Sequence, residues 1–176
     1  MLKLSLNQSC TIELVARLGG SATIPVNETI RLDNQLCYAV YNANRLFNKF
    51  YQLALAPFHL TYAQYVVLLA LWEEDGLMLH TLGRRLHLES STLTPLLKRL
   101  ESAGWLVRRR SSEDKRQLFV HLTDFGRRTQ SEVLQAVQNC GRQTDLTEDQ
   151  YRLDLKTIQE LNAALRKSIT DIAAEH

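Results

Sequence analysis

The segment from Ser90 to Thr123 constrains the fold most, because a helical pattern runs directly into a β-hairpin pattern within it. The stretch "SSTLTPLLKRLESAG" has Ser90 or Ser91 as its expected N-cap and Gly104 as its expected stop. The stretch "WLVRRRSSEDKRQLFVHLT" follows, and its two β-prone runs flank a polar, charged segment. This arrangement predicts a hairpin with a long charged tip. A chain with this order must pack a short sheet beside helices.

Three helices are predicted before this segment. Apolar residues recur at helical spacing from Asp33 to about Ala56, and the pattern stops at Pro57. The next helix opens with Thr61 and Gln64 in the S/T-x-x-E/Q capping-box pattern and ends at the "EEDG" turn. The stretch "LMLHTLGRRLHL" predicts a short third helix, which directly precedes the helix over "SSTLTPLLKRLESAG".

Two more helices are predicted after the hairpin. Thr123 opens one over "DFGRRTQSEVLQAVQNC", and a second capping box at Thr147 and Gln150 opens the last. The last helix carries an apolar stripe at Tyr151, Leu155, Ile158, Leu161, Leu165 and Ile169. The stripes of this helix and of the first exceed what one small lobe can cover, so we expect a homodimer. The predicted fold class is mainly α with a small β-hairpin.

A short helix, a tight connection, a second helix with polar residues at its start and a basic hairpin together describe a winged helix-turn-helix. The second helix of such a pair lies in the major groove of double-stranded DNA. Ser91, Thr92 and Thr94 suit contacts to base edges there, and Lys98 suits a phosphate or a guanine. Arg116, near the hairpin tip, suits the minor groove. Further basic candidates for DNA contacts are Arg99, Arg109 and Lys115.

The charge distribution supports a phosphate-binding surface. From Arg84 to Arg128 there are 11 Lys or Arg and 5 Asp or Glu, so this segment carries a net charge of +6, whereas the whole chain carries +2. A basic block is usually only a solvated face, and each polar residue named above is, taken alone, more simply a solvated side chain. Together, and inside a motif of this shape, they favour DNA binding.

The stretch "DKRQLFVHLTDFGR" resembles the wing signature of MarR-type repressors, with Asp114, Arg116, Leu122 and Thr123 at its matching positions. The stretches "LDNQLCYAVY", "LTYAQYVVLLALWEEDG" and "LTPLLKRLESAG" are similar to the organic-hydroperoxide-sensing OhrR branch of that family. The resemblance covers roughly residues 32–140. It implies a MarR-like homodimer that represses transcription from an inverted-repeat operator, and a wing salt bridge between Asp114 and Arg116.

The resemblance also implies a redox-sensing site. In this branch an N-terminal cysteine, here Cys37, is oxidised by organic hydroperoxides, and operator DNA is then released. Two tyrosines lie near the reactive thiol, and Tyr51 and Tyr62 occupy the matching positions. Cys140 is the candidate resolving thiol of a two-cysteine sensor.

Helix geometry adds an independent constraint on this site. Tyr51 lies 14 residues beyond Cys37 on the first predicted helix. The two residues therefore share a face but stand about 21 Å apart along the axis. If both serve one site, one of them must come from a second subunit whose first helix runs antiparallel.

The predicted domain organisation follows from these motifs. Residues 1–31, which include Cys10, are an arm of uncertain structure, and residues 32–176 are one MarR-like domain. Within that domain the winged helix-turn-helix covers about 61–123. The dimerisation helices are expected at about 33–56 and 124–173.

Composition excludes several other function classes. Three widely spaced cysteines make no disulfide framework, and no stretch is apolar enough to span a membrane, so we expect a cytoplasmic protein with free thiols. We expect neither a metal nor a cofactor, because the histidines are not paired with cysteines or carboxylates at ligand spacing. These histidines are His59, His80, His87, His121 and His176.

Two alternatives to the redox-sensing repressor stay open. One is a MarR-type repressor controlled by a small phenolic or anionic ligand, with Cys37 as inert packing. The other is a thiol peroxidase using Cys37, although nothing here resembles the scaffold of a known peroxidase. We therefore expect a regulator and not an enzyme.

Overall fold

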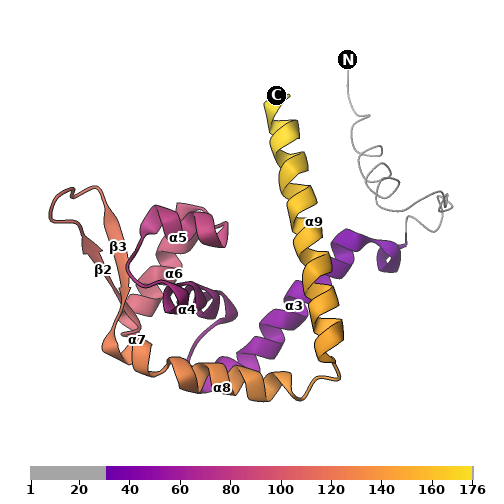
Figure 1. The fold of residues 1–176 in the computed structure, drawn as a ribbon, viewed down its shortest axis with the longest axis horizontal. Helices are drawn as coiled ribbons and strands as arrows, with labels where there is room; N and C mark the ends of the chain where they lie inside the picture. Colours follow the sequence, from indigo (N-terminus) through magenta and orange to yellow (C-terminus); the bar gives the residue numbers. More distant parts are fainter. Residues whose placement is uncertain (1–30, 176) are drawn as a thin grey trace. The chain divides into compact units, whose positions relative to one another are not determined.

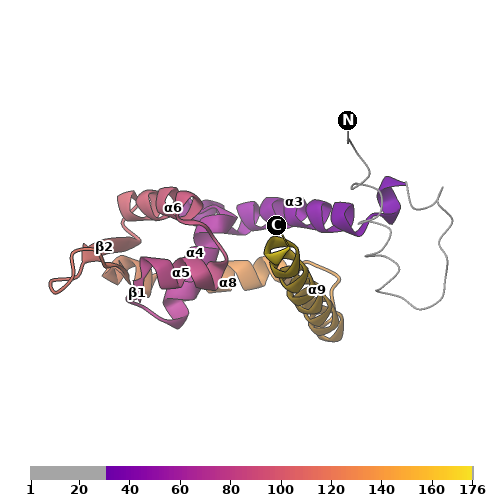
Figure 2. The same cartoon turned by 90° about the horizontal axis from the view of Figure 1, so that it is seen from above.

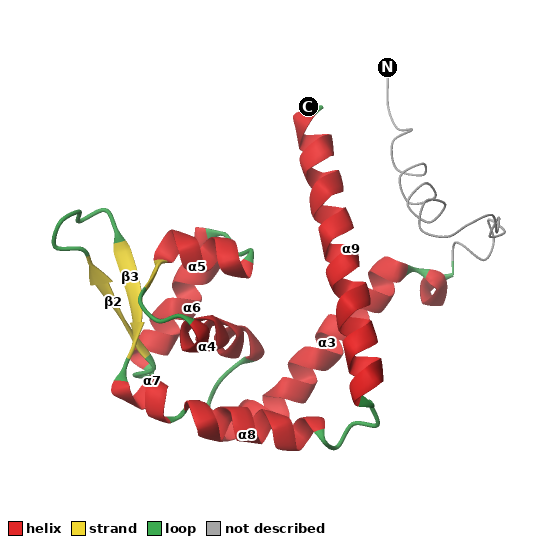
Figure 3. Ribbon diagram, viewed as in Figure 1, coloured by secondary structure: helices red, strands yellow, loops and turns green. Residues whose placement is uncertain are grey.

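A computed structural model describes residues 31–175, so Cys10, His176 and almost all of the predicted arm lie outside the described residues. The chain is mainly helical with a small antiparallel sheet (Figures 1 and 3). It divides into two compact units, Met1–Lys49 and Phe50–His176. The mainly α fold class with a β-hairpin is confirmed.

The described part of the first unit consists of a 3-10 turn, η1 (Leu32–Asn34), and the beginning of the long helix α3 (Leu36–Leu55). The predicted first helix is thus confirmed, with its ends one to three residues inside the expected range. Its large apolar side chains in this unit are exposed, including Leu36, Val40, Tyr41, Leu46 and Phe47.

The second unit contains the hydrophobic core. After the 3-10 turn η2 (Ala56–Phe58), helix α4 (Tyr62–Glu73) begins with the predicted capping box. Thr61 Oγ1 accepts from the Gln64 N–H, and Gln64 Oε1 accepts from the Thr61 N–H at 2.8 Å. Helices α5 (Leu79–Leu86) and α6 (Ser90–Ser102) follow. Figure 2 shows α4, α5 and α6 gathered beside the sheet, and these three helices supply much of the buried core.

The N-cap of α6 was predicted at Ser90 or Ser91 and is instead Glu89, whose backbone is extended and whose side chain makes no cap hydrogen bond. Both serines are therefore the first helical residues. The helix still ends as predicted before Gly104, which adopts a φ of 79°. That left-handed conformation suits glycine.

The sheet has the strand order β1-β3-β2, formed by β1 (Leu77–Met78), β2 (Leu106–Arg110) and β3 (Leu118–Leu122). The predicted hairpin is β2 and β3, paired from Leu106 with Leu122 to Arg110 with Leu118. The prediction of helix at Leu77 and Met78 was wrong. These residues pair with Val120 and Phe119 of β3, a distant contact that overrides the local helical pattern.

The helix predicted after Thr123 is two helices, α7 (Asp124–Arg128) and α8 (Gln130–Gly141), which meet at Thr129. Thr123 is the N-cap as predicted, and its Oγ1 accepts from the Gly126 N–H at 3.0 Å. α7 lies against the end of the sheet, where a Cβ on Gly126 would approach the Trp105 carbonyl oxygen to 2.2 Å. This close packing fixes the short helix.

The last helix, α9 (Glu148–Ala174), begins at the predicted cap, where Thr147 Oγ1 accepts from the Gln150 N–H. The Gln150 side chain instead donates to Asp154 Oδ1 at 2.7 Å, so the expected box is not reciprocal. No residue of α9 is buried, and its apolar stripe is exposed in the single chain apart from half-buried Leu161.

Among residues 31–175 no single helix is long and apolar enough to cross a membrane. One bent pair, Leu36–Phe58 with Tyr62–Glu73, passes that test jointly at a bend of 71°, by length and composition only.

Candidate functional site

Helix α6 has an apolar face and a polar face of the kind expected for a DNA-reading helix. Leu93, Leu97 and Leu100 are buried, and they attach the helix to the core of the second unit. The side chains predicted to contact DNA all lie on the exposed side of the helix: Ser91, Thr92, Thr94, Lys98 and Arg99. The helix therefore presents hydroxyl groups in its first turns and cations further along, which suits base edges and phosphates respectively.

The β2–β3 hairpin adds exposed cations to the same unit, at Arg109, Lys115 and Arg116. Arg110 closes the tip, because its Nη1 donates to the Lys115 carbonyl oxygen at 2.8 Å. Asp114 Oδ1 accepts from the backbone N–H of Arg116 at 2.9 Å. The contact between Asp114 and Arg116 thus runs through the backbone, and their side-chain salt bridge stays a prediction.

An ion pair that sequence reasoning missed joins the hairpin to α6. Glu101 accepts from the backbone N–H of Arg108 at 2.8 Å and from its Nη2 at 2.7 Å and Nε at 2.9 Å. The hydrogen bonds from the Arg108 side chain lower the pKa of Glu101 below its ordinary value, against the opposing effect of desolvation. This fork fixes the direction of β2 relative to the helix that presents the side chains predicted to contact DNA.

Two cysteines lie within the described residues, and both are free thiols. Cys37 is exposed and is the second residue of α3, in the helix's N-terminal turn. Cys140 is half-buried near the end of α8. The two belong to different units, so each is described by itself.

Tyr51 and Tyr62, predicted to serve the thiol site, stack on each other with ring centroids 4.5 Å apart. Tyr65 stacks on Tyr51 at 5.5 Å and completes the cluster. Sequence reasoning missed Tyr65, although its position three residues after Tyr62 places both on one face of α4. We call these three residues the tyrosine cluster.

Burial raises the pKa values of the tyrosine cluster. Desolvation, with smaller contributions from Tyr65, Tyr62, Tyr151 and Cys140, raises the pKa of Tyr51 to about 12. Desolvation also raises the pKa of Tyr62, and it raises that of Tyr65 together with the charges of Tyr62 and Tyr151. Phenols of ordinary pKa are already protonated at neutral pH, and the raised pKa values extend this protonation to higher pH. The three side chains can therefore donate hydrogen bonds to a thiolate or a peroxide oxygen.

Among residues 31–175 no group of three His, Cys, Asp or Glu side chains is placed to hold a metal ion. The chemistry available in the described part of the chain is that of thiols, phenols and a cationic surface.

Comparisons with known proteins agree with this geometry. The family model for the transcriptional regulator SarA/Rot matches residues 49–137. The HTH-type transcriptional regulator TtmR of Methylorubrum extorquens is 43% identical over 145 residues, which cover 81% of this chain and 74% of the relative. The organic hydroperoxide resistance transcriptional regulator of Bacillus subtilis is also 43% identical, over 97 residues that cover 55% of this chain and 66% of the relative.

Among solved structures the chain is similar to AbfR of Staphylococcus epidermidis. Reduced AbfR bound to DNA superposes with a TM-score of 0.72 at 45% identity, covering 81% of this chain and 97% of AbfR. The disulfide-formed AbfR gives a TM-score of 0.58 at the same identity, covering 81% and 95%.

Proposed function

This chain belongs to the SarA/Rot family of MarR-type winged-helix transcriptional regulators, and we propose that it is a DNA-binding repressor that senses organic hydroperoxides through Cys37. Relatives that match most of its length are transcriptional regulators, and none of those described above is an enzyme. We place its action in the cytoplasm, where operator DNA is accessible.

The observation that carries DNA binding is the exposed polar face of α6 above its buried leucines, with a cationic hairpin in the same unit. AbfR, which has been solved on DNA, shares this fold. Ser91, Thr92 and Thr94 contact base edges in the proposed complex, while Lys98, Arg99 and the hairpin cations neutralise phosphates or enter the minor groove. These hairpin cations are Arg109, Lys115 and Arg116.

The operator is proposed to be an inverted repeat bound by a homodimer. The exposed apolar stripes of α3 and α9 supply surface for the partner, so residues 33–56 and 124–173 act as the dimerisation helices around a DNA-binding region at about 61–123. A two-fold dimer places its two α6 helices in successive major grooves, with half-sites about one turn apart.

The proposed chemistry uses the thiols as the reductant. The Cys37 thiolate attacks the distal oxygen of an organic hydroperoxide, so that an S–O bond forms, the O–O bond breaks and the alcohol leaves with a proton. The sulfenic acid then condenses with the Cys140 thiol to give a disulfide and water. Two thiols supply the two electrons that reduce the peroxide. Tyr51 and Tyr62, as protonated phenols, are proposed to donate hydrogen bonds to the sulfur or the peroxide oxygen.

Four observations support the sensing role. Cys37 is a free, exposed thiol, and the tyrosine cluster is buried at Tyr65, half-buried at Tyr51 and Tyr62, and close enough to Cys140 for that thiol to contribute to the raised pKa of Tyr51. The Bacillus subtilis relative is a regulator of organic hydroperoxide resistance, and AbfR has been solved both reduced and with its disulfide formed.

The test measures operator affinity by fluorescence anisotropy before and after addition of cumene hydroperoxide, with mass spectrometry of the thiols. The duplex is one selected from a random library by the reduced protein. We expect a large loss of affinity on oxidation, which Cys37→Ser abolishes. Release of the Cys37→Ser protein as readily as the parent would contradict the sensing role and favour a ligand-controlled repressor. Catalytic turnover with a thiol reductant, without any effect on DNA binding, would favour a peroxidase.

A further inference from the structure

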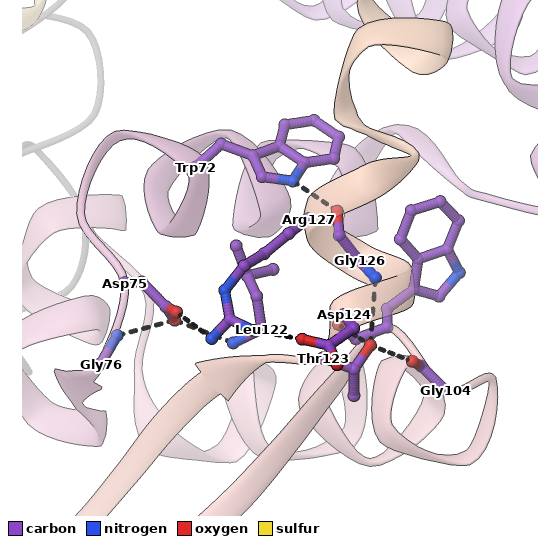
Figure 4. A network of polar contacts seen from close by, with 10 residues as sticks. Trp72, Asp75, Gly76, Gly104, Leu122, Thr123, Asp124, Gly126 and Arg127 are labelled. Carbon is purple, nitrogen blue, oxygen red and sulfur yellow. Dashed lines mark hydrogen bonds and ion pairs between the residues drawn. The ribbon is translucent and has the colours of Figure 1, made fainter.

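Helix α7 is held to the rest of the second unit by a carboxylate that accepts three hydrogen bonds (Figure 4). Asp75, in the loop after α4, accepts at Oδ1 from the backbone N–H groups of Gly76 and Leu122, each at 2.8 Å. Its Oδ2 accepts from Arg127 Nη2 at 2.7 Å. One side chain thus joins the end of α4, the end of β3 and helix α7.

The position of Asp75 explains why it reaches β3. Strand β1 pairs Leu77 with Val120 in an antiparallel ladder, so continuing that register would place Asp75 opposite Leu122. The ladder stops at Leu77, and the Asp75 carboxylate takes the Leu122 N–H. Gly76 makes the turn with a φ of 73°. This conformation is strained for any residue with a side chain.

Three further contacts fix α7 from the other sides. Trp72 Nε1 donates to the Gly126 carbonyl oxygen at 2.9 Å, and Thr123 Oγ1 donates to the Gly104 carbonyl oxygen at 2.6 Å. The backbone of Gly126 also packs directly against the Trp105 carbonyl. We call Asp75, Arg127 and these contacts the α7 clamp.

The α7 clamp is connected to the tyrosine cluster and to Cys140 by two short routes. Helix α4 carries Tyr62 and Tyr65 near its beginning and Trp72 near its end, and the Tyr65 and Trp72 rings are in edge contact at 6.3 Å. Helix α7 continues through Thr129 into α8, which carries Cys140. A displacement at the Cys140 end of α8 therefore reaches the α7 clamp before it reaches the hairpin.

We propose that Asp75 and Arg127 are positioning residues that tie α8 to the β2–β3 hairpin, so that displacement of α8 on oxidation is converted into loss of operator affinity. This inference rests on the proposed function. It assigns a role in transmission to two residues that lie outside the predicted DNA-contacting set and outside the predicted thiol site.

The exposure of the ion pair distinguishes this role from simple stabilisation. The Arg127 side chain is 49% exposed and that of Asp75 31%. A pair as exposed as this contributes little to global stability. Cutting it therefore leaves the fold intact but removes one of the links between α7 and the α4–β1 loop.

The chain supplies a matched control for the test. Arg127 and Arg128 are adjacent exposed arginines of α7, and only Arg127 pairs with Asp75. Arg127→Gln and Arg128→Gln both remove one positive charge, so any general weakening of DNA binding is shared. Asp75→Asn and the double variant with Arg127→Gln complete a cycle that measures the coupling of the pair.

Affinity for the selected operator duplex is measured for the reduced protein and after cumene hydroperoxide, and intact-mass spectrometry confirms equal oxidation. We expect the parent and Arg128→Gln to lose affinity on oxidation by the same factor. Arg127→Gln and Asp75→Asn should lose it by a factor at least threefold smaller, and the double variant should resemble the single variants.

If oxidation lowers the operator affinity of Arg127→Gln and Arg128→Gln by the same factor, the inference is overturned while the proposed function stays intact. Absence of release in the parent protein would instead overturn the proposed function. Thermal unfolding is recorded for each variant, and Arg127→Gln is decisive because it retains both backbone hydrogen bonds to Asp75. If a variant of Asp75 or Arg127 loses operator affinity equally in its reduced and oxidised forms, in step with a loss of thermal stability, the ion pair has a purely structural role, and this result would also overturn the inference.

Discussion

Replacing Gly126 by alanine tests the packing of α7 directly. A Cβ at this position would lie 2.2 Å from the Trp105 carbonyl oxygen and 3.3 Å from Leu122 Cδ2. Because the nearer atom belongs to the backbone, relief requires α7 itself to move. That movement strains the hydrogen bonds from Trp72 Nε1 to the Gly126 carbonyl and from the Gly126 N–H to Thr123 Oγ1.

The magnitude follows from three contributions. Overpacking of a close contact costs about 1–3 kcal/mol, and each weakened hydrogen bond costs about 0.5–1.5 kcal/mol. Alanine offsets about 1 kcal/mol of this through its better helix propensity. We expect Gly126→Ala to lower the free energy of unfolding by about 1–5 kcal/mol, which corresponds to a fall of several degrees in Tm.

Gly141→Ala is the matched control, because it also lies in a helix and a Cβ there meets no atom within 4 Å. It should leave stability unchanged or raise it by up to about 1 kcal/mol. Both variants are compared with the parent by urea and thermal denaturation at one protomer concentration, since the stability of a dimer depends on concentration. Equal stability of Gly126→Ala and Gly141→Ala would refute the packing argument.

Other expected outcomes concern DNA binding, assembly and redox chemistry. Arg116→Ala should weaken operator binding, and the affinity of the parent should fall steeply with salt; insensitivity to both would contradict the DNA-binding surface. Truncation before Thr147 should lower dimer stability and operator affinity in sedimentation and anisotropy, whereas a stable folded monomer at micromolar concentration would argue against the dimer. Because the pKa of Glu101 is lowered in the folded state, its charge stabilises the fold at pH values above its ordinary pKa, and this contribution is lost as pH falls through the lowered value. Glu101→Gln should therefore flatten the fall of unfolding free energy at acid pH. An unchanged fall would count against the ion pair with Arg108. Cys37→Ser should bind DNA but keep its affinity when hydroperoxide is added. Cys140→Ser should still respond to hydroperoxide, but its oxidation should stop at sulfenic acid or at a mixed disulfide with a small thiol. Disulfide-linked dimers of the Cys140→Ser variant would exclude Cys140 as the resolving thiol.

Sequence reasoning succeeds where the controlling contacts are local. The caps at Thr61, Thr123 and Thr147 each bond to a backbone N–H three residues on, so the residue pattern contains the whole interaction. The two faces of α6 likewise follow from helical periodicity. The exposed side of α6, which carries the predicted DNA-contacting residues, could therefore be predicted without any knowledge of the tertiary fold.

The same reasoning fails where the partner is distant in sequence. Asp75 accepts hydrogen bonds from residues 47 and 52 positions away, and no local pattern marks an aspartate in a turn as a link between three elements. The two-residue strand β1 likewise depends on its pairing with β3, more than 40 residues further along the chain. The face of α6 that is predicted to contact DNA can thus be identified from local periodicity. The contacts that fix this face relative to α8, which carries Cys140, form only on folding. In the proposed mechanism, helix α6 can therefore be recognised from the sequence, whereas its coupling to Cys140 depends on distant pairs such as Asp75 and Arg127.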